Sequence, residues 1–177
     1  MSRFPLLAIA VYFLLTENYL PAAIILVVSW LTDLLDGIVA RKRNEITELG
    51  KIIDPLADKI TIITLVVILF LKEIIPLWFL IITLSRDVLI LLGGLYLKNK
   101  FQLVLASNIT GKISVFIIGL TIMVLLINHS LKLESLELLI KGLILLSVTA
   151  CLISLINYSA RFINIIKTKG DRNVNKS

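Results

Sequence analysis

The chain has 177 residues, of which 58% are hydrophobic, and its mean hydropathy is +1.00. A soluble protein of this composition would have too few polar side chains to cover its surface, so the composition predicts an integral membrane protein. The 18 Lys and Arg exceed the 12 Asp and Glu and give a net charge of +6, which in a membrane protein marks cytoplasmic loops and contacts with anionic headgroups, and we expect no binding to nucleic acid.

Six apolar runs follow one another along the chain and cover residues 4–16, 21–40, 60–71, 74–97, 103–128 and 136–166. None alternates polar and apolar residues as a strand would, so we expect helices. The first run is short for a transmembrane helix, and the third needs a helix that begins near Asp54 or before it to cross a bilayer. The sequence therefore predicts an all-α integral membrane protein with six transmembrane helices, in a single domain over residues 1–170 that is followed by a polar cytoplasmic tail at 171–177.

The Lys and Arg residues of the predicted connections gather on one side of the membrane, the side that holds both ends of the chain. The opposite connections contain only Lys72, Lys132 and Lys141. Because cytoplasmic loops carry an excess of Lys and Arg, we expect both termini in the cytoplasm, with a multi-pass topology in the cell membrane. The connection between the second and third helices then faces the cytoplasm.

Four aspartates stand around this connection. Asp33 and Asp36 are three residues apart and Asp54 and Asp58 are four apart, so each pair shares one face of a helix if the helices continue through them. Pro55 suits the first turn of a helix, with Asp54 as its cap. An ionised Asp at membrane depth costs about 2.5–3.5 kcal/mol, so something must offset four of them. Divalent cations that prefer carboxylate oxygens, Mg²⁺, Mn²⁺ or Ca²⁺, would do so, whereas zinc would favour His and Cys ligands.

Small residues accompany the aspartates. Gly37 and Ala40 continue the face of the first pair, and Gly50 lies four residues before Asp54. Glycine is unfavourable inside a helix unless another group must approach the backbone closely. The forked guanidinium of Arg41 could bind a phosphate or a neighbouring carboxylate. Because Mg²⁺ sites commonly share their ion with substrate phosphates, these residues together indicate a diphosphate substrate.

The aspartates and their small neighbours fill the pattern D-x2-D-G-x2-A-R-x8-G-x3-D-x3-D, which resembles the signature of the CDP-alcohol phosphatidyltransferases. The resemblance implies the helical bundle of that family, a homodimer, and a reaction in which an acceptor hydroxyl attacks the β-phosphorus of CDP-diacylglycerol and releases CMP. It implies two Mg²⁺ or Mn²⁺ ions held by Asp33, Asp36, Asp54 and Asp58, with Asp58 also the general base. It implies a CDP site formed by Asp33, Gly37, Ala40, Arg41 and Gly50.

Three further cations are candidates for binding a phosphorylated acceptor. Arg86 has apolar flanks, where an unpaired charge is expensive, so it should pair with Asp87 or face a polar cavity. Lys112 lies near the beginning of the fifth run and Arg161 lies near the end of the sixth, so the three could converge near the aspartates. A role for Lys112 as a simple snorkelling anchor stays equally open.

The acceptor is less well defined than the donor. The segments ITLSRD and TGKIS resemble the branch of the family that uses glycerol 3-phosphate and makes phosphatidylglycerophosphate, although Ser114 and Val115 replace a Lys and a Thr of that branch. Glycerol 3-phosphate is the leading acceptor, with inositol phosphate, serine and phosphatidylglycerol, which would give cardiolipin, as alternatives. A non-catalytic cation transporter or scaffold would explain aspartates in membrane helices, but it leaves the spacing of the small residues and Arg41 unexplained.

Overall fold

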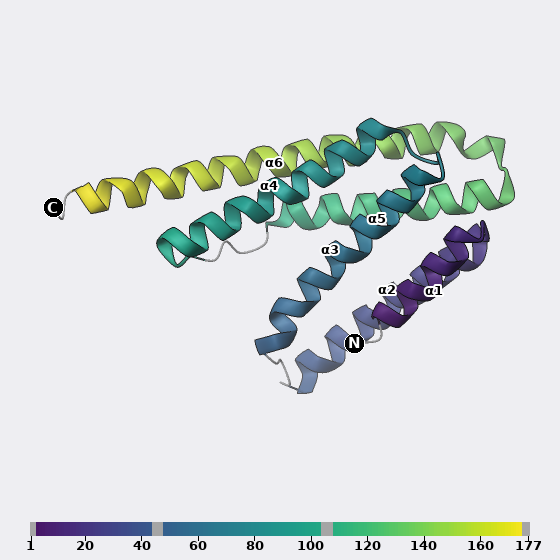
Figure 1. Ribbon diagram of the computed structural model, residues 1–177, viewed down its shortest axis with the longest axis horizontal. Helices are drawn as coiled ribbons and strands as arrows, with labels where there is room; N and C mark the ends of the chain where they lie inside the picture. The colour runs from purple at the N-terminus through teal and green to yellow at the C-terminus, as the bar shows by residue number, and fades with distance from the viewer. Residues whose placement is uncertain (1–2, 44–47, 104–107, 175–177) are drawn as a thin grey trace. The chain divides into compact units, whose positions relative to one another are not determined.

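The computed structural model describes residues 3–43, 48–103 and 108–174, with side chains described over 5–32, 59–103 and 108–168. Within these residues the chain is helical and contains no strand, which confirms the all-α prediction (Figure 1). The helices are α1 (Arg3–Leu15), α2 (Tyr19–Arg43), α3 (Glu48–Leu71), α4 (Leu77–Phe101), α5 (Ile109–Leu131), the short 3₁₀ helix η1 (Glu134–Leu136) and α6 (Glu137–Val174).

Three helical segments are long and apolar enough to cross a bilayer, namely Leu77–Phe101, Ile109–Leu131 and Glu134–Thr168. Their outer faces carry exposed side chains such as Leu92, Leu145 and Ile156, which are 56%, 65% and 66% exposed and suit a lipid environment. The other described apolar stretches are shorter: Pro5–Leu15, Tyr19–Thr32 and Lys59–Leu71. The structure thus supports a membrane protein, and the count of six transmembrane helices stays a prediction.

The start of α3 corrects one expectation from the sequence. α3 begins at Glu48, so Pro55 lies seven residues inside the helix and Asp54 is not its N-terminal cap. The preceding residues, 48–54, extend the helix backward and give α3 24 residues, or about 36 Å of length. The expectation that this helix begins near Asp54 or before it is confirmed.

Four of the described helices are followed by a residue in the left-handed conformation, and none of these residues is glycine. They follow α1, α3, α4 and α5 and are Glu17, Glu73, Gln102 and Lys132, with φ of 63°, 59°, 52° and 51°. After α3, the Ile74 N–H bonds the Leu69 carbonyl at 2.9 Å, as in a Schellman motif. A non-glycine residue in this conformation costs about 1–2 kcal/mol, so these helix ends are slightly strained.

The chain divides into two compact units, which we describe separately. The first consists of Met1–Pro76 and Ile122–Ile140. In it α1 packs against α2 and α3. The fully buried residues there include Ala10, Leu14, Ala22, Val66 and Leu69.

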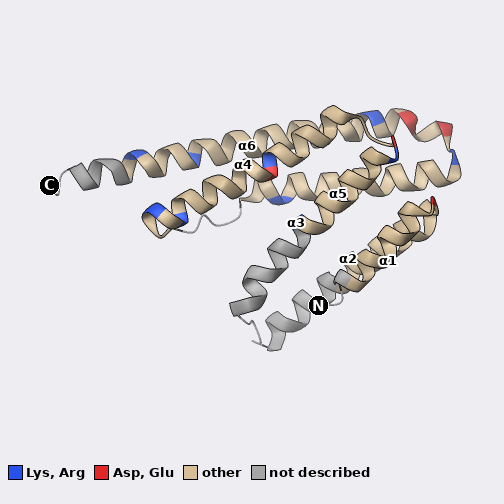
Figure 2. Ribbon diagram, viewed as in Figure 1, with Lys and Arg blue, Asp and Glu red and all other residues tan. Residues whose placement is uncertain are grey.

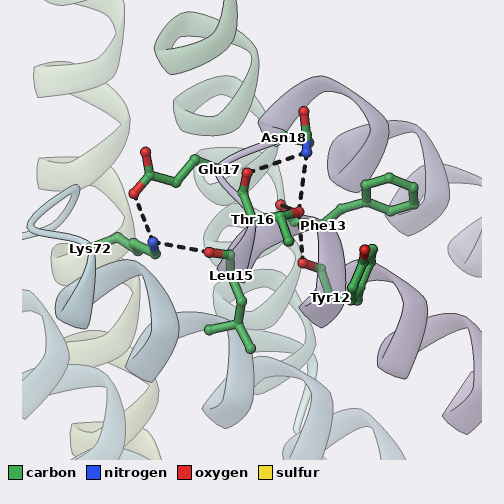
Figure 3. A network of polar contacts seen from close by, with 7 residues as sticks. All are labelled: Tyr12, Phe13, Leu15, Thr16, Glu17, Asn18 and Lys72. Carbon is green, nitrogen blue, oxygen red and sulfur yellow. Dashed lines mark hydrogen bonds and ion pairs between the residues drawn. The ribbon is translucent and has the colours of Figure 1, made fainter.

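A polar contact joins the loops of this first unit. Lys72, just after α3, donates from Nζ to Glu17 Oε1 at 2.9 Å and to the Leu15 carbonyl at 3.2 Å (Figure 3). Leu15 is the last residue of α1, and Glu17 lies in the turn between α1 and α2. The contact therefore ties the end of α3 to the end of α1 and to the turn that leads into α2.

The second unit consists of Leu77–Thr121 and Lys141–Ser177, and it contains α4, the first half of α5 and most of α6. α4 and α6 run side by side in the same direction (Figure 1). Arg86 donates a hydrogen bond to Ser154, and further along both helices the tilted rings of Tyr96 and Phe162 lie with their centroids 5.9 Å apart. α5 runs antiparallel to α6. The C-terminal parts of α4 and α6 and the beginning of α5 therefore lie at the same end of this unit.

Candidate functional site

The predicted donor site is divided between two helices of the first unit. The α2 backbone carries Asp33, Asp36, Gly37, Ala40 and Arg41, and the α3 backbone carries Gly50, Asp54 and Asp58. Both aspartate pairs therefore lie within continuous helices, as the argument from their spacing requires. Their side chains lie outside the described residues, so their metal-binding, CDP-binding and catalytic roles stay predictions.

Among the side chains that are described, no group of three or more His, Cys, Asp and Glu residues comes together as a metal site would require. The only cysteine, Cys151, is buried in α6. The four motif aspartates lie outside the side chains searched. They remain the candidate metal ligands by the chemistry of their carboxylate oxygens, which suit Mg²⁺ and Mn²⁺.

The described part of the candidate acceptor site is built around Arg86 on α4. Figure 2 shows charged residues mainly near the ends of the described helices, with one paired basic and acidic segment inside α4. Arg86 and Asp87 are 5% and 6% exposed, and Arg86 Nη1 donates to Asp87 Oδ1 at 2.5 Å. The predicted pairing of Arg86 with Asp87 is confirmed. A charge at this position needs such a partner, because an unpaired charge is costly in a membrane helix.

The other end of the guanidinium joins two further helices. Arg86 Nη2 donates to Ser114 Oγ on α5 and to Ser154 Oγ on α6, each at 2.9 Å, and to the Gly111 carbonyl at 3.3 Å. The Ser114 hydroxyl donates in turn to the Gly111 carbonyl at 2.9 Å. The Nε of Arg86 is buried and has no partner among the described atoms. We call Arg86, Asp87, Ser114 and Ser154 the Arg86 cluster.

Gly111 lets Arg86 approach the beginning of α5. A Cβ at this position would lie 3.2 Å from Arg86 Nη2 and 3.6 Å from Ser154 Oγ. The first of these distances is shorter than ordinary van der Waals contact. The absence of a side chain at Gly111 thus allows its carbonyl to accept from the guanidinium.

Lys112 and Arg161 differ from Arg86 in their surroundings. Both are exposed, whereas Arg86 is buried. Lys112 directly follows Gly111, and Arg161 lies two helical turns beyond Ser154 on the same face of α6. The structure places both cations at the end of the second unit where α5 begins, and Arg86 further inside.

The serines of the Arg86 cluster were not predicted. A signal for them exists in the sequence, because Ser114 and Thr121 are seven residues apart on α5, as are Ser147 and Ser154 on α6. Thr121 Oγ1 and Ser147 Oγ lie 2.7 Å apart. Small polar residues are enriched where membrane helices pack, and their hydroxyl groups bond across the helices.

The sequence of the chain is similar to sequences of a known protein family. Residues 1–157 match the sequence pattern of the family described as CDP-alcohol phosphatidyltransferase. The chain belongs to this family. Membership confirms the resemblance carried by the aspartate motif and makes the chain a membrane transferase of phospholipid biosynthesis.

The relatives of the chain are described as enzymes of more than one activity. The chain is 34% identical over 170 residues to a CDP-diacylglycerol--glycerol-3-phosphate 3-phosphatidyltransferase of Aquifex aeolicus, covering 94% of each chain. It is 34% identical to a Bacillus subtilis protein of the same description over 66% of this chain and 59% of the relative. It is 35% identical to a cardiolipin synthase (CMP-forming) of Streptomyces coelicolor over 54% of this chain and 44% of the relative.

The family match contains the aspartate motif and the whole Arg86 cluster, since it extends to residue 157. Arg161 lies beyond the matched residues. Family membership therefore supports a phosphatidyltransferase without assigning a role to Arg161.

Proposed function

We propose that this CDP-alcohol phosphatidyltransferase transfers the phosphatidyl group of CDP-diacylglycerol to glycerol 3-phosphate, releasing CMP and forming phosphatidylglycerophosphate. The observation that carries the proposal is the similarity to the Aquifex aeolicus relative along nearly the full length of both chains. That relative is described as a CDP-diacylglycerol--glycerol-3-phosphate 3-phosphatidyltransferase, which names glycerol 3-phosphate as its acceptor.

We propose that Asp33, Asp36, Asp54 and Asp58 hold two Mg²⁺ or Mn²⁺ ions. The helix lengths support a shared site, because Asp36 follows the first residue of α2 by 17 positions and Asp54 precedes the last residue of α3 by 17 positions. At 1.5 Å per residue, both would lie about 25 Å from the end where Lys72 contacts Glu17. Bound there, the ions would neutralise the diphosphate and stabilise the departing CMP.

The residues of the motif have separate roles in this proposal. The hydroxyl oxygen of the acceptor attacks the β-phosphorus, and Asp58 accepts the hydroxyl proton. The bond from that phosphorus to the CMP oxygen breaks. A positioned general base contributes about 10²- to 10⁴-fold to the rate. The residues proposed to hold the CDP group are Asp33, Gly37, Ala40, Arg41 and Gly50.

We propose that the phosphate of glycerol 3-phosphate is bound by Lys112, Arg161 and Arg86. The side chains of Lys112 and Arg161 are exposed and make no hydrogen bond or ion pair with another described residue, so they are available to a ligand. Arg86 would contribute from inside the protein through its free Nε. The backbone N–H groups at the beginning of α5 would add to this attraction for an anion.

Cardiolipin formation is the second candidate, because several relatives are described as cardiolipin synthases. In that reaction the acceptor is phosphatidylglycerol, which carries a phosphodiester and two acyl chains. The matches to these relatives cover little more than half of this chain, which favours glycerol 3-phosphate.

The architecture that we propose has six transmembrane helices in one domain over residues 1–170, followed by a polar tail at 171–177. Both termini and the aspartate motif would face the cytoplasm from the cell membrane, and the chain would form a homodimer. The excess of Lys and Arg on the side of both termini supports this orientation.

The test is an assay of the purified protein with CDP-diacylglycerol, Mg²⁺ or Mn²⁺, and one acceptor at a time: glycerol 3-phosphate, phosphatidylglycerol, inositol phosphate or serine. Lipid products are identified by mass spectrometry and CMP is quantified. We expect phosphatidylglycerophosphate and one CMP for each product molecule. Product from phosphatidylglycerol alone would replace this proposal with cardiolipin synthesis, and no CMP release with any acceptor would favour a transporter or scaffold.

A further inference from the structure

We propose that Ser114 and Ser154 are positioning residues, which hold the Arg86 guanidinium and through it fix the beginning of α5, with Lys112, against the part of α6 that leads to Arg161. The inference rests on the proposed role of these cations in binding the acceptor phosphate. The ligand of these cations is therefore a small phosphorylated alcohol.

The two serines are placed to act on Arg86 and not on a substrate. Ser114 is 0% exposed and Ser154 is 2% exposed, and each oxygen accepts from Arg86 Nη2 at 2.9 Å. Hydrogen bonds with a charged donor are stronger than those between neutral groups. The serines come from different helices, so one guanidinium nitrogen fixes α5 and α6 to α4 together.

The exposed cations are close in sequence to these contacts. Gly111 accepts from Arg86 at 3.3 Å and is the residue directly before Lys112. Arg161 is seven residues after Ser154 and shares its helix face, about 10 Å along the axis. A shift of the guanidinium would therefore move the backbone that carries Lys112 and alter its position relative to Arg161.

A second contact between the same helices shows that joining them does not require a charge. Thr121 and Ser147 join α5 to α6 through neutral hydroxyl groups 2.7 Å apart. A buried arginine costs more in a membrane helix than such a pair. Its Nε is also left without a partner. Asp87 balances the charge of Arg86, and among the described atoms the unpartnered Nε is the donor of the guanidinium that a further anion could use.

The first test compares Ser114→Ala, Ser154→Ala and the double variant with Ser147→Ala, which removes a buried hydroxyl from the same helix pair away from Arg86. We expect the double variant to raise KM for glycerol 3-phosphate about tenfold, equivalent to about 1.4 kcal/mol of binding, with KM for CDP-diacylglycerol unchanged. Ser154→Thr, which keeps a hydroxyl, should restore most of the affinity. Ser147→Ala should leave both KM values unchanged.

The second test does not depend on turnover. Spin labels at Lys112→Cys and Arg161→Cys, in a Cys151→Ala background of the full chain, report the distance between the two positions. We expect a narrow distribution with both serines present, a broader one in Ser114→Ala/Ser154→Ala, and no broadening with Ser147→Ala.

The two tests separate the inference from the proposed function. If the parent protein makes no product from glycerol 3-phosphate, the proposed function fails and the distance measurement still decides whether the serines position the two helices. Unchanged distances overturn the inference, as does an equal rise in both KM values, which would indicate a general loss of structure. A broadened distance distribution with an unchanged KM for glycerol 3-phosphate would overturn the claim that this positioning serves acceptor binding.

Discussion

Lys72 lies within 2.9 Å of Glu17, and this ion pair joins the loop after α3 to the loop before α2 (Figure 3). α2 begins and α3 ends near this ion pair, and each carries its part of the aspartate motif in the half that is farther from it. The hydrogen bond from Lys72 and its charge lower the pKa of Glu17 below its ordinary value of 4.5, with a smaller contribution from the charge of His129. The ionised form of Glu17 is therefore favoured in the folded protein.

This pKa shift predicts a pH-dependent contribution to stability. Because the pKa of Glu17 is lowered on folding, its contribution is present above pH 4.5 and is lost as the pH falls through the lowered pKa. We expect Glu17→Gln to lower the unfolding temperature slightly at pH 7, with a difference from the parent protein that shrinks as the pH falls below 4.5. Glu73→Gln is the control, since Glu73 makes no ion pair with a described residue. A difference that persists unchanged at pH 3 would contradict this prediction.

The left-handed residue after α5 predicts a stabilising substitution. Lys132 has φ of 51°, and its N–H bonds the Asn128 carbonyl at 2.8 Å. Glycine adopts this conformation without steric cost, so Lys132→Gly should stabilise the protein by about 0.5–1 kcal/mol, measured by thermal unfolding in detergent. Lys132→Ala keeps the steric cost and should give no gain. Equal effects of glycine and alanine would show that the backbone conformation is not the cause.

The buried pair of Arg86 and Asp87 on α4 predicts that removing one charge destabilises the protein more than removing both. Arg86→Met leaves the Asp87 carboxylate buried without its partner and should destabilise the protein by about 3–5 kcal/mol. Arg86→Met/Asp87→Leu removes both charges and should recover much of that loss. Thermal unfolding of both variants and of Asp87→Leu completes a double-mutant cycle. Additive effects would mean that the two side chains do not interact as the 2.5 Å contact indicates.

These pairs also show which parts of the site the sequence reveals. The Arg86–Asp87 pair was predictable because its members are adjacent and a lone charge is costly among apolar residues. Ser114 and Ser154 were not, because they are 28 and 68 residues from Arg86 and serine is common in membrane helices. Their partner depends on how the helices pack, which no local spacing determines.

The helices differ in how well the sequence alone predicts their ends. The apolar runs located each of the six α-helices that the described residues form, because a long run without polar and apolar alternation indicates a helix. The beginning of α3 was less well defined, since the polar residues before Pro55 resemble a loop in composition. The aspartate motif identified the family because its chemistry requires fixed spacing along two helices.

Two glycines of α5 provide a matched test of the Arg86 cluster. A Cβ at Gly111 would lie 3.2 Å from Arg86 Nη2, whereas a Cβ at Gly119 would have no neighbour within 4 Å. Gly111→Ala should displace the guanidinium, lower the unfolding temperature and raise KM for glycerol 3-phosphate several-fold. Gly119→Ala should keep the parent KM and stabilise the helix by up to about 1 kcal/mol. Similar behaviour of the two variants would rule out a close approach at Gly111.

Removal of divalent metal tests the role proposed for the four aspartates. Chelation with EDTA should stop CMP release, and added Mg²⁺ or Mn²⁺ should restore it, because carboxylate oxygens prefer these ions. Asp58→Asn removes the proposed base and one charged ligand and should lower kcat by at least about 10²-fold. Asp171→Asn, a change of the same kind in the predicted tail, should keep full activity. CMP release that survives either EDTA or Asp58→Asn would remove the basis for a metal site with Asp58 as its base.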